Sequence, residues 1–323
     1  MSESAPLTAI PTAPAPDGGA AEWVLGHKGA RLRAALFPAK GEVRGSVVLS
    51  GGRTEPIEKY FEVIDDLTGR GFVVLAHDWR GQGLSHRDLA DDRLKGHADG
   101  FEPFLADYDA LLAQFEARLP KPWIAMGHSM GGCLTLLALA KGQADRFAGA
   151  ILSAPMLGVR VGRYPKAVRL LVGLNRLMGR AGGYCMGDPG KPFDDTFDDN
   201  VLTHDRTRFA RARAQIAANR DLALGAPTWG WLDFALRAAD FFGRPANLAS
   251  VTIPVVICQA EQEKLVDNEA QDHVARSLPD GRLAVVKGAL HEILMETDAR
   301  RAVFWAEFDA LAAEIARSSS PSA

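Results

Sequence analysis

Residues 126–132 (MGHSMGG) join a short apolar run to a long apolar segment that begins at Cys133. The pattern G-x-S-x-G in such a place is typical of a nucleophile elbow, a strained turn between a strand and a helix. Gly127 and Gly131 stand two residues before and two after the serine, where small residues let neighbouring backbone approach. The elbow would hold Ser129 at the carboxyl edge of a sheet and at the amino end of a helix. Ser129 is therefore the candidate nucleophile.

The composition is that of a large globular protein. With 323 residues, 47% of them hydrophobic and 24% charged, the chain predicts one α/β domain with an insertion. The net charge of −3 gives no overall field for nucleic acid, so we expect no nucleic-acid partner. Cys133, Cys185 and Cys258 show no metal or redox spacing, and we expect neither a metal nor a cofactor. Unpaired cysteines also indicate a reducing compartment, and we expect the cytoplasm.

The sequence predicts neither a signal peptide nor a membrane-spanning segment. Residues 1–20 are rich in proline and alanine and lack the pattern of a signal peptide, so we predict a disordered tail. No uninterrupted apolar stretch reaches the roughly 20 residues that a membrane-spanning helix needs. We therefore expect no transmembrane anchor.

Strand-like apolar runs alternate with amphipathic helical ones, which predicts an α/β fold with a mostly parallel sheet flanked by helices. From residue 156 to residue 247 the alternation stops and only helical segments follow one another. We expect residues 21–155 and 248–318 to form the core, and residues 156–247 to form a helical lid inserted over the carboxyl edge of the sheet. The predicted strands are 31–37, 46–50, 72–77, 123–126, 150–153, 254–259 and 282–287, and the predicted helices are 57–70, 101–119, 132–141, 165–179, 205–219, 229–242 and 269–277.

A serine nucleophile needs a histidine base and an acid, and in this architecture they follow in the order serine, acid, histidine. His291 comes directly after the last predicted strand, so it would project from the same sheet edge as Ser129. His128 adjoins the nucleophile and His77 ends a strand. We interpret both of these as packing residues.

Three carboxylates compete as the acid in the loop after the predicted strand 254–259, and of these Glu261 follows the strand too closely and is expected at the surface. Glu263 has the better position, and a glutamate orients an imidazole as well as an aspartate does. Asp267 directly precedes a helical run, where its oxygen would accept a backbone N–H as an N-cap. Glu263 is the predicted triad acid, and Asp267 stays the alternative.

Four motifs together carry a family resemblance. Residues 49–55 (LSGGRTE), 78–85 (DWRGQGLS), 127–132 (GHSMGG) and 287–292 (KGALHE) resemble the monoacylglycerol-lipase and lysophospholipase branch of the α/β hydrolases. Residues 200–204, 225–229 and 259–268 resemble the bacterial lysophospholipases in particular. The resemblance covers roughly residues 23–315, and it implies that the triad acid is Glu263, where the monoacylglycerol lipases carry aspartate.

The loop after the strand 46–50 departs from the family pattern. The lipases usually have a His-Gly pair there, whereas this chain has SGGR at residues 50–53. A backbone donor does not depend on its side chain, so we predict an oxyanion hole made by Gly52 and Met130. Arg53 either contacts a substrate phosphate or forms a salt bridge with Glu55 or Glu58.

The predicted lid indicates the substrate class. Residues 156–187 carry six basic and no acidic side chains among apolar ones, which favours peripheral contact with an anionic membrane. Pairing with the aspartates that follow is an equally natural role for these charges. We expect most aromatic residues on the helix 229–242 to pack the lid against the core and about one or two to line an acyl tunnel, with Trp229 as the predicted substrate contact. The basic side chains are Arg160, Arg163, Lys166, Arg169, Arg176 and Arg180; the aspartates are Asp194, Asp195, Asp198 and Asp199; the aromatics are Trp229, Trp231, Phe234, Phe241 and Phe242.

These features predict a serine esterase or lipase that hydrolyses the acyl ester of a lysophospholipid or monoacylglycerol through an acyl-enzyme, in the cytoplasm or at the inner face of the membrane. A carboxylesterase for small soluble esters is the alternative within enzymes. A prolyl-type aminopeptidase would need acidic lid residues for a peptide amine, and the first half of this lid is basic. A non-catalytic binding module of the same fold would need a broken triad, and would not react with a fluorophosphonate.

Overall fold

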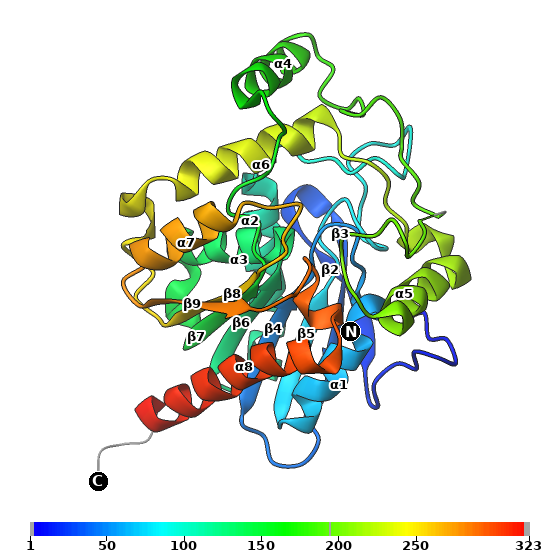
Figure 1. The fold of residues 1–323 in the computed structure, drawn as a ribbon. Helices are drawn as coiled ribbons and strands as arrows, with labels where there is room; N and C mark the ends of the chain where they lie inside the picture. The colour runs from blue at the N-terminus through cyan, green and yellow to red at the C-terminus, as the bar shows by residue number, and fades with distance from the viewer. Residues whose placement is uncertain (1–2, 194, 320–323) are drawn as a thin grey trace.

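The computed structural model describes residues 3–193 and 195–319, and in them nine strands form one sheet (Figure 1). The strand order is β1-β2-β3-β5-β4-β6-β7-β8-β9. The strands are β1 (Ser4–Ala5), β2 (Ala20–Leu25), β3 (Arg31–Phe37), β4 (Gly45–Ser50), β5 (Phe72–His77), β6 (Trp123–His128), β7 (Gly149–Ser153), β8 (Val255–Ala260) and β9 (Gly281–Val286).

The sheet is parallel from β5 to β9 and antiparallel at its other edge. β5, β4, β6, β7, β8 and β9 pair in parallel, whereas β1, β2 and β3 pair antiparallel with one another and with β5. The central strands β4, β5, β6, β7 and β8 are buried along their whole length. Such continuous apolar runs are typical of strands covered on both faces, and the predicted fold class is confirmed.

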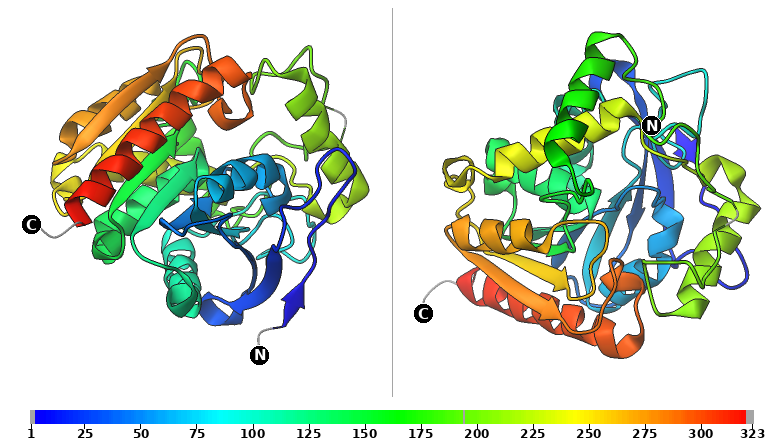
Figure 2. Two further views of the ribbon diagram at one scale, coloured as in Figure 1. Left: turned by 90° about the horizontal axis from the view of Figure 1, so that it is seen from below. Right: turned by 45° about the horizontal axis from the view of Figure 1, so that its top comes forward.

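Helices cover both faces of the sheet (Figures 1 and 2). α1 (Phe61–Gly69) and the long C-terminal α8 (Asp298–Ser319) pack in one apolar cluster on one face. α2 (Glu102–Phe115), α3 (Met130–Ala138) and α7 (Asn268–Ser277) contribute to the cluster on the other face. These helices cover the faces of the sheet and not the carboxyl ends of its parallel strands, where the candidate site lies.

The N-terminal segment is part of the fold, so the prediction of a disordered tail over residues 1–20 is wrong for its described residues. β1 pairs with β2, and the side chains of Ala5 and Ala13 are buried. The backbone N–H of Thr8 donates to Glu58 Oε1 at 3.0 Å. Proline-rich composition disfavours interior strands, but a short segment at a sheet edge tolerates it because edge N–H groups need no partner.

The segment between β7 and β8, which was expected to be the lid, contains three α-helices that we call the insertion (residues 156–247). They are α4 (Pro165–Leu177), α5 (Arg206–Ala218) and α6 (Trp229–Phe242). α6 packs against the core through Phe234 and Ala238, and α4 lies on the outer side of α6. In Figures 1 and 2 α4 projects furthest from the sheet, well away from α5. Among the described residues, no helix is both long and apolar enough to cross a membrane.

Candidate active site

Ser129 lies in the turn between β6 and α3, with the backbone conformation that an elbow requires. Its φ is +49° and its ψ is −117°, a region that residues other than glycine rarely occupy. The turn is fixed because Ser129 N–H donates to the carbonyl of Ser153, while its own carbonyl accepts from Cys133 and Met156. The serine is therefore held in its strained position by the surrounding backbone.

Gly127 and Gly131 allow this turn to form. A Cβ atom at Gly131 would lie 2.2 Å from the carbonyl oxygen of Ser50, and one at Gly127 would lie 2.7 Å from the Cα of Gly132. Both distances are shorter than any real contact. The structure thus gives the steric reason for the small residues on either side of the elbow.

Ser129, His291 and Glu263 form one hydrogen-bonded chain. His291 Nε2 lies 2.9 Å from Ser129 Oγ, and His291 Nδ1 lies 2.6 Å from Glu263 Oε2. His291 follows β9 and Glu263 follows β8, so both come from loops at the carboxyl edge. His291 and Glu263 are buried. This is the geometry in which a histidine takes the serine proton while a carboxylate fixes its tautomer.

Glu263 is ionised by its surroundings. Its other oxygen, Oε1, accepts backbone N–H groups from Lys264, Leu265 and Val266. Burial acts to raise the pKa of Glu263, but the hydrogen bond and charge of His291, with the backbone donors, outweigh it and lower the pKa. A carboxylate held in this way stabilises the imidazolium that forms during reaction.

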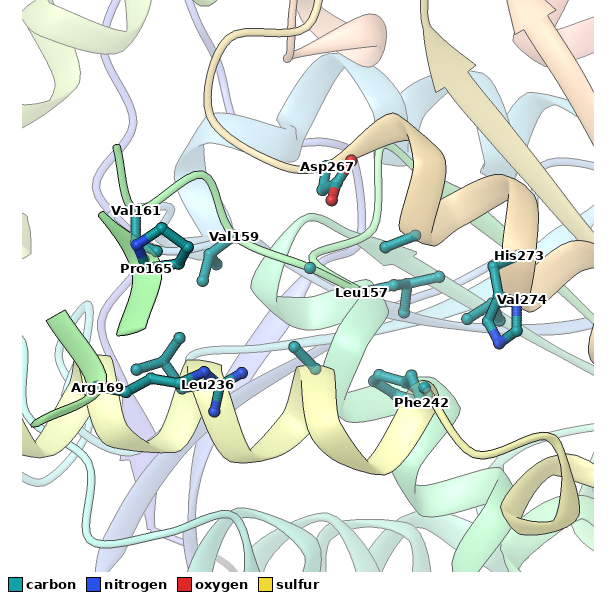
Figure 3. Close-up of a pocket in the computed structure, with 14 residues that line it drawn as sticks. Leu157, Val159, Val161, Pro165, Arg169, Leu236, Phe242, Asp267, His273 and Val274 are labelled. Atoms are coloured by element: carbon teal, nitrogen blue, oxygen red, sulfur yellow. The ribbon is translucent and has the colours of Figure 1, made fainter. Parts of the chain in front are cut away.

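Asp267 is not part of this chain. Its Oδ1 accepts the N–H of Glu269 at 2.9 Å and so caps α7. Asp267 lines a smaller pocket of about 220 Å³ between α6, α7 and residues 157–165 (Figure 3). Neither Ser129 nor His291 lines that pocket. The alternative acid is therefore wrong, and the capping interpretation of Asp267 is confirmed.

The predicted oxyanion donor Gly52 is already engaged. Its N–H donates to Glu55 Oε2 at 2.5 Å, and Tyr60 donates to the same oxygen. In the described residues no acceptor lies within hydrogen-bonding range of the N–H groups of Arg53 and Met130. The assignment of Gly52 is contradicted, because a buried carboxylate three residues later uses its N–H. The neighbouring free donor in the same loop is Arg53.

Sequence reasoning missed a buried charge network beside the triad. Lys59 Nζ lies 2.7 Å from Glu55 and 2.5 Å from Glu292, the residue after His291. Burial acts to raise the pKa of Glu55, but Lys59 and His128 lower it to about 2. Lys59 thus ties the loop of the free N–H groups to the loop of the catalytic histidine. In the sequence, Glu55, Lys59 and Glu292 are ordinary charged residues, and no local pattern indicates that they contact one another.

The other histidines near the site are packing residues, as predicted. His128 Nδ1 lies 3.0 Å from the carbonyl oxygen of Ser153, and its ring packs against that of His291. His77 Nε2 lies 3.0 Å from Ser50 Oγ, and burial lowers the pKa of His77 to about 3. No group of three or more potential metal ligands gathers within the described ranges.

Ser129 and His291 line a cavity of about 620 Å³ whose wall includes residues of the insertion. Met156, Trp231 and Leu232 give it apolar walls, and Arg53 also lines it. Trp229 does not: it lies at a separate surface depression with Gly183. The predicted contact Trp229 is wrong, because residues two apart on a helix point in nearly opposite directions and Trp231 faces the cavity.

Arg53 forms neither of the salt bridges considered for it. Glu55 pairs with Lys59, and Glu58 pairs with the buried Arg33. Arg53 Nη2 donates instead to the carbonyl of Gly225 in the insertion, and its guanidinium lies over the Trp231 ring, 5.4 Å from the centroid.

A serine at a strand-to-helix elbow of a mostly parallel sheet, linked through a histidine to a buried glutamate, defines a serine hydrolase of the α/β-hydrolase class. The chain belongs to the family described as serine aminopeptidase S33, whose model matches residues 41–298.

Relatives in this family agree with the predicted branch. Lysophospholipase L2 of Escherichia coli (strain K12) is 36% identical over 270 residues, which cover 80% of this chain and 77% of the relative. Monoacylglycerol lipase of Mycolicibacterium smegmatis is 25% identical over 283 residues, covering 84% of this chain and 90% of the relative. The resemblance to the monoacylglycerol-lipase and lysophospholipase branch is confirmed.

Solved structures agree on the fold. A soluble variant of monoglyceride lipase from Saccharomyces cerevisiae matches with a TM-score of 0.69 at 20% identity, covering 91% of this chain and 96% of that chain. A carboxyl esterase from Bacillus coagulans matches with a TM-score of 0.73 at 19% identity, covering 92% and 99%.

Proposed function

We propose that this protein is a serine esterase that hydrolyses the acyl ester of a lysophospholipid or monoacylglycerol. The observation that carries the proposal is the unbroken chain from Ser129 through His291 to Glu263, at the floor of a cavity with apolar walls. The names of its relatives, lysophospholipase L2 and monoacylglycerol lipase, support the same class of ester. A cavity of about 620 Å³ is in the range that holds an acyl chain with a small head group.

The reaction would proceed in two halves. Ser129 Oγ attacks the ester carbonyl carbon while His291 Nε2 takes the hydroxyl proton. His291 then gives this proton to the departing glycerol oxygen, and the acyl group stays on the serine. Water, losing a proton to His291, attacks the acyl-enzyme, and His291 gives this proton to Ser129 Oγ as the acyl–oxygen bond breaks and the fatty acid leaves. Glu263 remains ionised throughout and holds His291 in the productive tautomer.

We propose Met130 and Arg53 as the backbone donors of the oxyanion hole. Met130 is the first residue of α3, and Arg53 carries the free N–H in the loop after β4. Each donor of this kind contributes about 3–4 kcal/mol to transition-state stabilisation. The bond between Glu55 and the Gly52 N–H supports this assignment because it fixes the loop that presents Arg53.

We also propose that the insertion acts as a lid that contacts an anionic membrane through α4. Leu170, Leu174 and Leu177 are exposed on α4, on the side opposite its buried Val172. In the part of the chain that the structure describes, no carboxylate lies within 4 Å of Lys166 or Arg180. An apolar helix face flanked by cations suits the interface of an anionic bilayer.

The aspartates that were expected to pair with these charges do not do so. Arg169 and Arg176 pair with Asp240 and Asp233 of α6 instead. Asp195 pairs with Arg213 and Asp198 with Arg206, both on α5, and Asp194 lies outside the described residues. The cytoplasm and the inner face of the membrane remain the proposed location.

Release of fatty acid from lysophosphatidylcholine, monoacylglycerol and p-nitrophenyl butyrate by wild type and Ser129→Ala tests the proposal. We expect turnover of at least one lipid ester, lost by several orders of magnitude in the variant. Fluorophosphonate labelling should modify Ser129 in the wild type alone. Turnover of only the short ester would leave a general carboxylesterase, and equal rates in both proteins would remove Ser129 from the reaction.

A further inference from the structure

We propose that the Arg53 guanidinium is the anion subsite of the catalytic cavity and binds the phosphate of a lysophospholipid, which makes the enzyme prefer phospholipid over neutral monoacylglycerol. This inference rests on the proposed function and adds the head-group class. The same residue would then serve twice, with its backbone toward the reacting carbonyl and its side chain toward the phosphate.

Arg53 is a half-buried cation, and the described residues supply no counter-charge for it. Within the described chain the only hydrogen bond of its guanidinium is to the carbonyl of Gly225, and its Nε has no acceptor although it is shielded from solvent. No carboxylate of the described residues lies within 4 Å of its guanidinium. Burial lowers the pKa of Arg53 to about 10, so the group remains charged at neutral pH. A half-buried cation of this kind is costly unless a ligand supplies the anion.

The carboxylates that line the same cavity contact other cations. Glu55 and Glu292 share Lys59, and Asp195 lies 2.9 Å from Arg213. None of the three pairs with Arg53, so the described residues leave Arg53 without a counter-charge at the cavity wall. Arg160 is a second such cation, since its Nε donates to the carbonyl of Val266 and no described carboxylate pairs with it.

The chemistry of a phosphodiester fits this wall. Guanidinium groups bind phosphate through parallel N–H bonds, and such charge-assisted bonds are strong where water is excluded. The extended arginine side chain and the glycerol backbone of a lysophospholipid are similar in length, so carbonyl and phosphate reach the two ends of one residue. The Trp231 ring beside the guanidinium restricts its orientation. A monoacylglycerol offers only hydroxyl groups at this position.

The test compares lysophosphatidylcholine with a monoacylglycerol that carries the same decanoyl chain, both below their critical micelle concentrations, in wild type and Arg53→Gln. The substitution keeps the backbone N–H. We expect kcat/KM to fall at least about tenfold more with the lysophospholipid than with the monoacylglycerol, the loss expected for one charge-assisted bond. Arg53→Lys should recover part of the difference.

Arg87→Gln is the matched control. Arg87 is also a half-buried arginine whose guanidinium donates only to carbonyl oxygens, and desolvation lowers its pKa to about 10, but it does not line the cavity. It should shift the activities on both substrates together. An equal loss on both substrates in Arg53→Gln would overturn the inference and leave Arg53 as a strut between its loop and Gly225.

A binding measurement separates this inference from the proposed function. Calorimetry with an ether-linked lysophosphatidylcholine and the matching ether-linked glycerol lipid needs no turnover and uses Ser129→Ala with and without Arg53→Gln. Tighter binding of the phosphate-bearing lipid, lost with Arg53, supports the subsite even if hydrolysis of lipid esters is absent. Equal affinities for both lipids would refute it even if both esters are hydrolysed.

Discussion

Two helices of the insertion, α5 and α4, are attached to the rest of the protein in different ways. Arg208 of α5 is largely buried and contacts Glu62, Asp205 and Asp298, while Gln215 donates to the carbonyl of Glu58. α4 has only two buried side chains and rests on α6, with ion pairs whose partners are mostly exposed. Figure 2 shows α5 against the body of the molecule and α4 at its periphery. The insertion is therefore not held uniformly, because α5 is attached by shielded ion pairs and α4 by largely exposed ones.

Among the substitutions that test this difference between α5 and α4, Arg208→Met should cause the largest loss of stability. It removes a guanidinium that bonds to three carboxylates and to the carbonyl of Glu296. Charge-assisted bonds in a shielded site predict a loss of about 2–3 kcal/mol in the free energy of unfolding. Urea unfolding measures it. A loss near zero would mean that α5 is held by its apolar contacts alone.

The second largest effect should come from the exposed leucines of α4, which we expect to contribute to membrane affinity. Leu170→Asp combined with Leu177→Asp should lower affinity for anionic phosphatidylglycerol vesicles about thirtyfold, since two apolar side chains no longer enter the interface. Vesicle co-sedimentation measures the affinity, with hydrolysis of p-nitrophenyl butyrate confirming an intact site. Ala217→Asp on the exposed side of α5 is the matched control and should change little. Equal losses in both variants would assign the effect to charge rather than to the α4 face.

The α5 anchor should also depend on pH. Burial acts to raise the pKa of Glu62, but Arg208, Arg211 and Arg301 lower it to about 2. A depressed carboxyl pKa gives stability that is fully present above the unfolded value near 4.3 and is lost as the pH falls toward 2.

Wild type should therefore exceed Glu62→Gln by about 1–2 kcal/mol at neutral pH, once solvent screening of this partly exposed group is allowed for. The gap should shrink below about pH 4.3. Unfolding curves at several pH values check the sign. A gap that stays constant would show that Glu62 acts through packing instead of through its charge.

The smallest effect belongs to the α4 ion pairs. Arg176→Met removes a pair with Asp233 whose arginine is 39% exposed, so stability should change by no more than about 0.5 kcal/mol. Thermal unfolding beside Arg208→Met gives the direct comparison. A loss as large as that of Arg208→Met would abolish the distinction between the two helices.

Much of the site was predictable from sequence because the triad depends on strand order. Ser129, Glu263 and His291 each follow a parallel strand, and such strands end at one edge whatever the details of packing. The proposed oxyanion donor Arg53 was not predictable in the same way. Which N–H stays free depends on Glu55 folding back onto Gly52, and this contact is not encoded in any local pattern.

The remaining errors have the same physical origin. Trp229 and Trp231 are two tryptophans of the same helix, so the sequence does not distinguish them. The rotation of α6 on the core decides which one faces the cavity. β1 and β2 escaped prediction because they are short and are stabilised by pairing at the sheet edge, with no local signal of their own. The burial of core strands is predictable from their apolar sequences, whereas the pairing of edge strands and the orientation of helix faces depend on neighbouring elements.

The left-handed backbone of Ser129 also bears on how such a protein would evolve. A residue with a side chain is held there against its preference, and glycine would occupy the same turn without strain. In a duplicated copy released from catalysis, replacement of this serine by glycine would be favoured by folding itself. Stability alone thus favours loss of the nucleophile, and selection for turnover is what retains the serine.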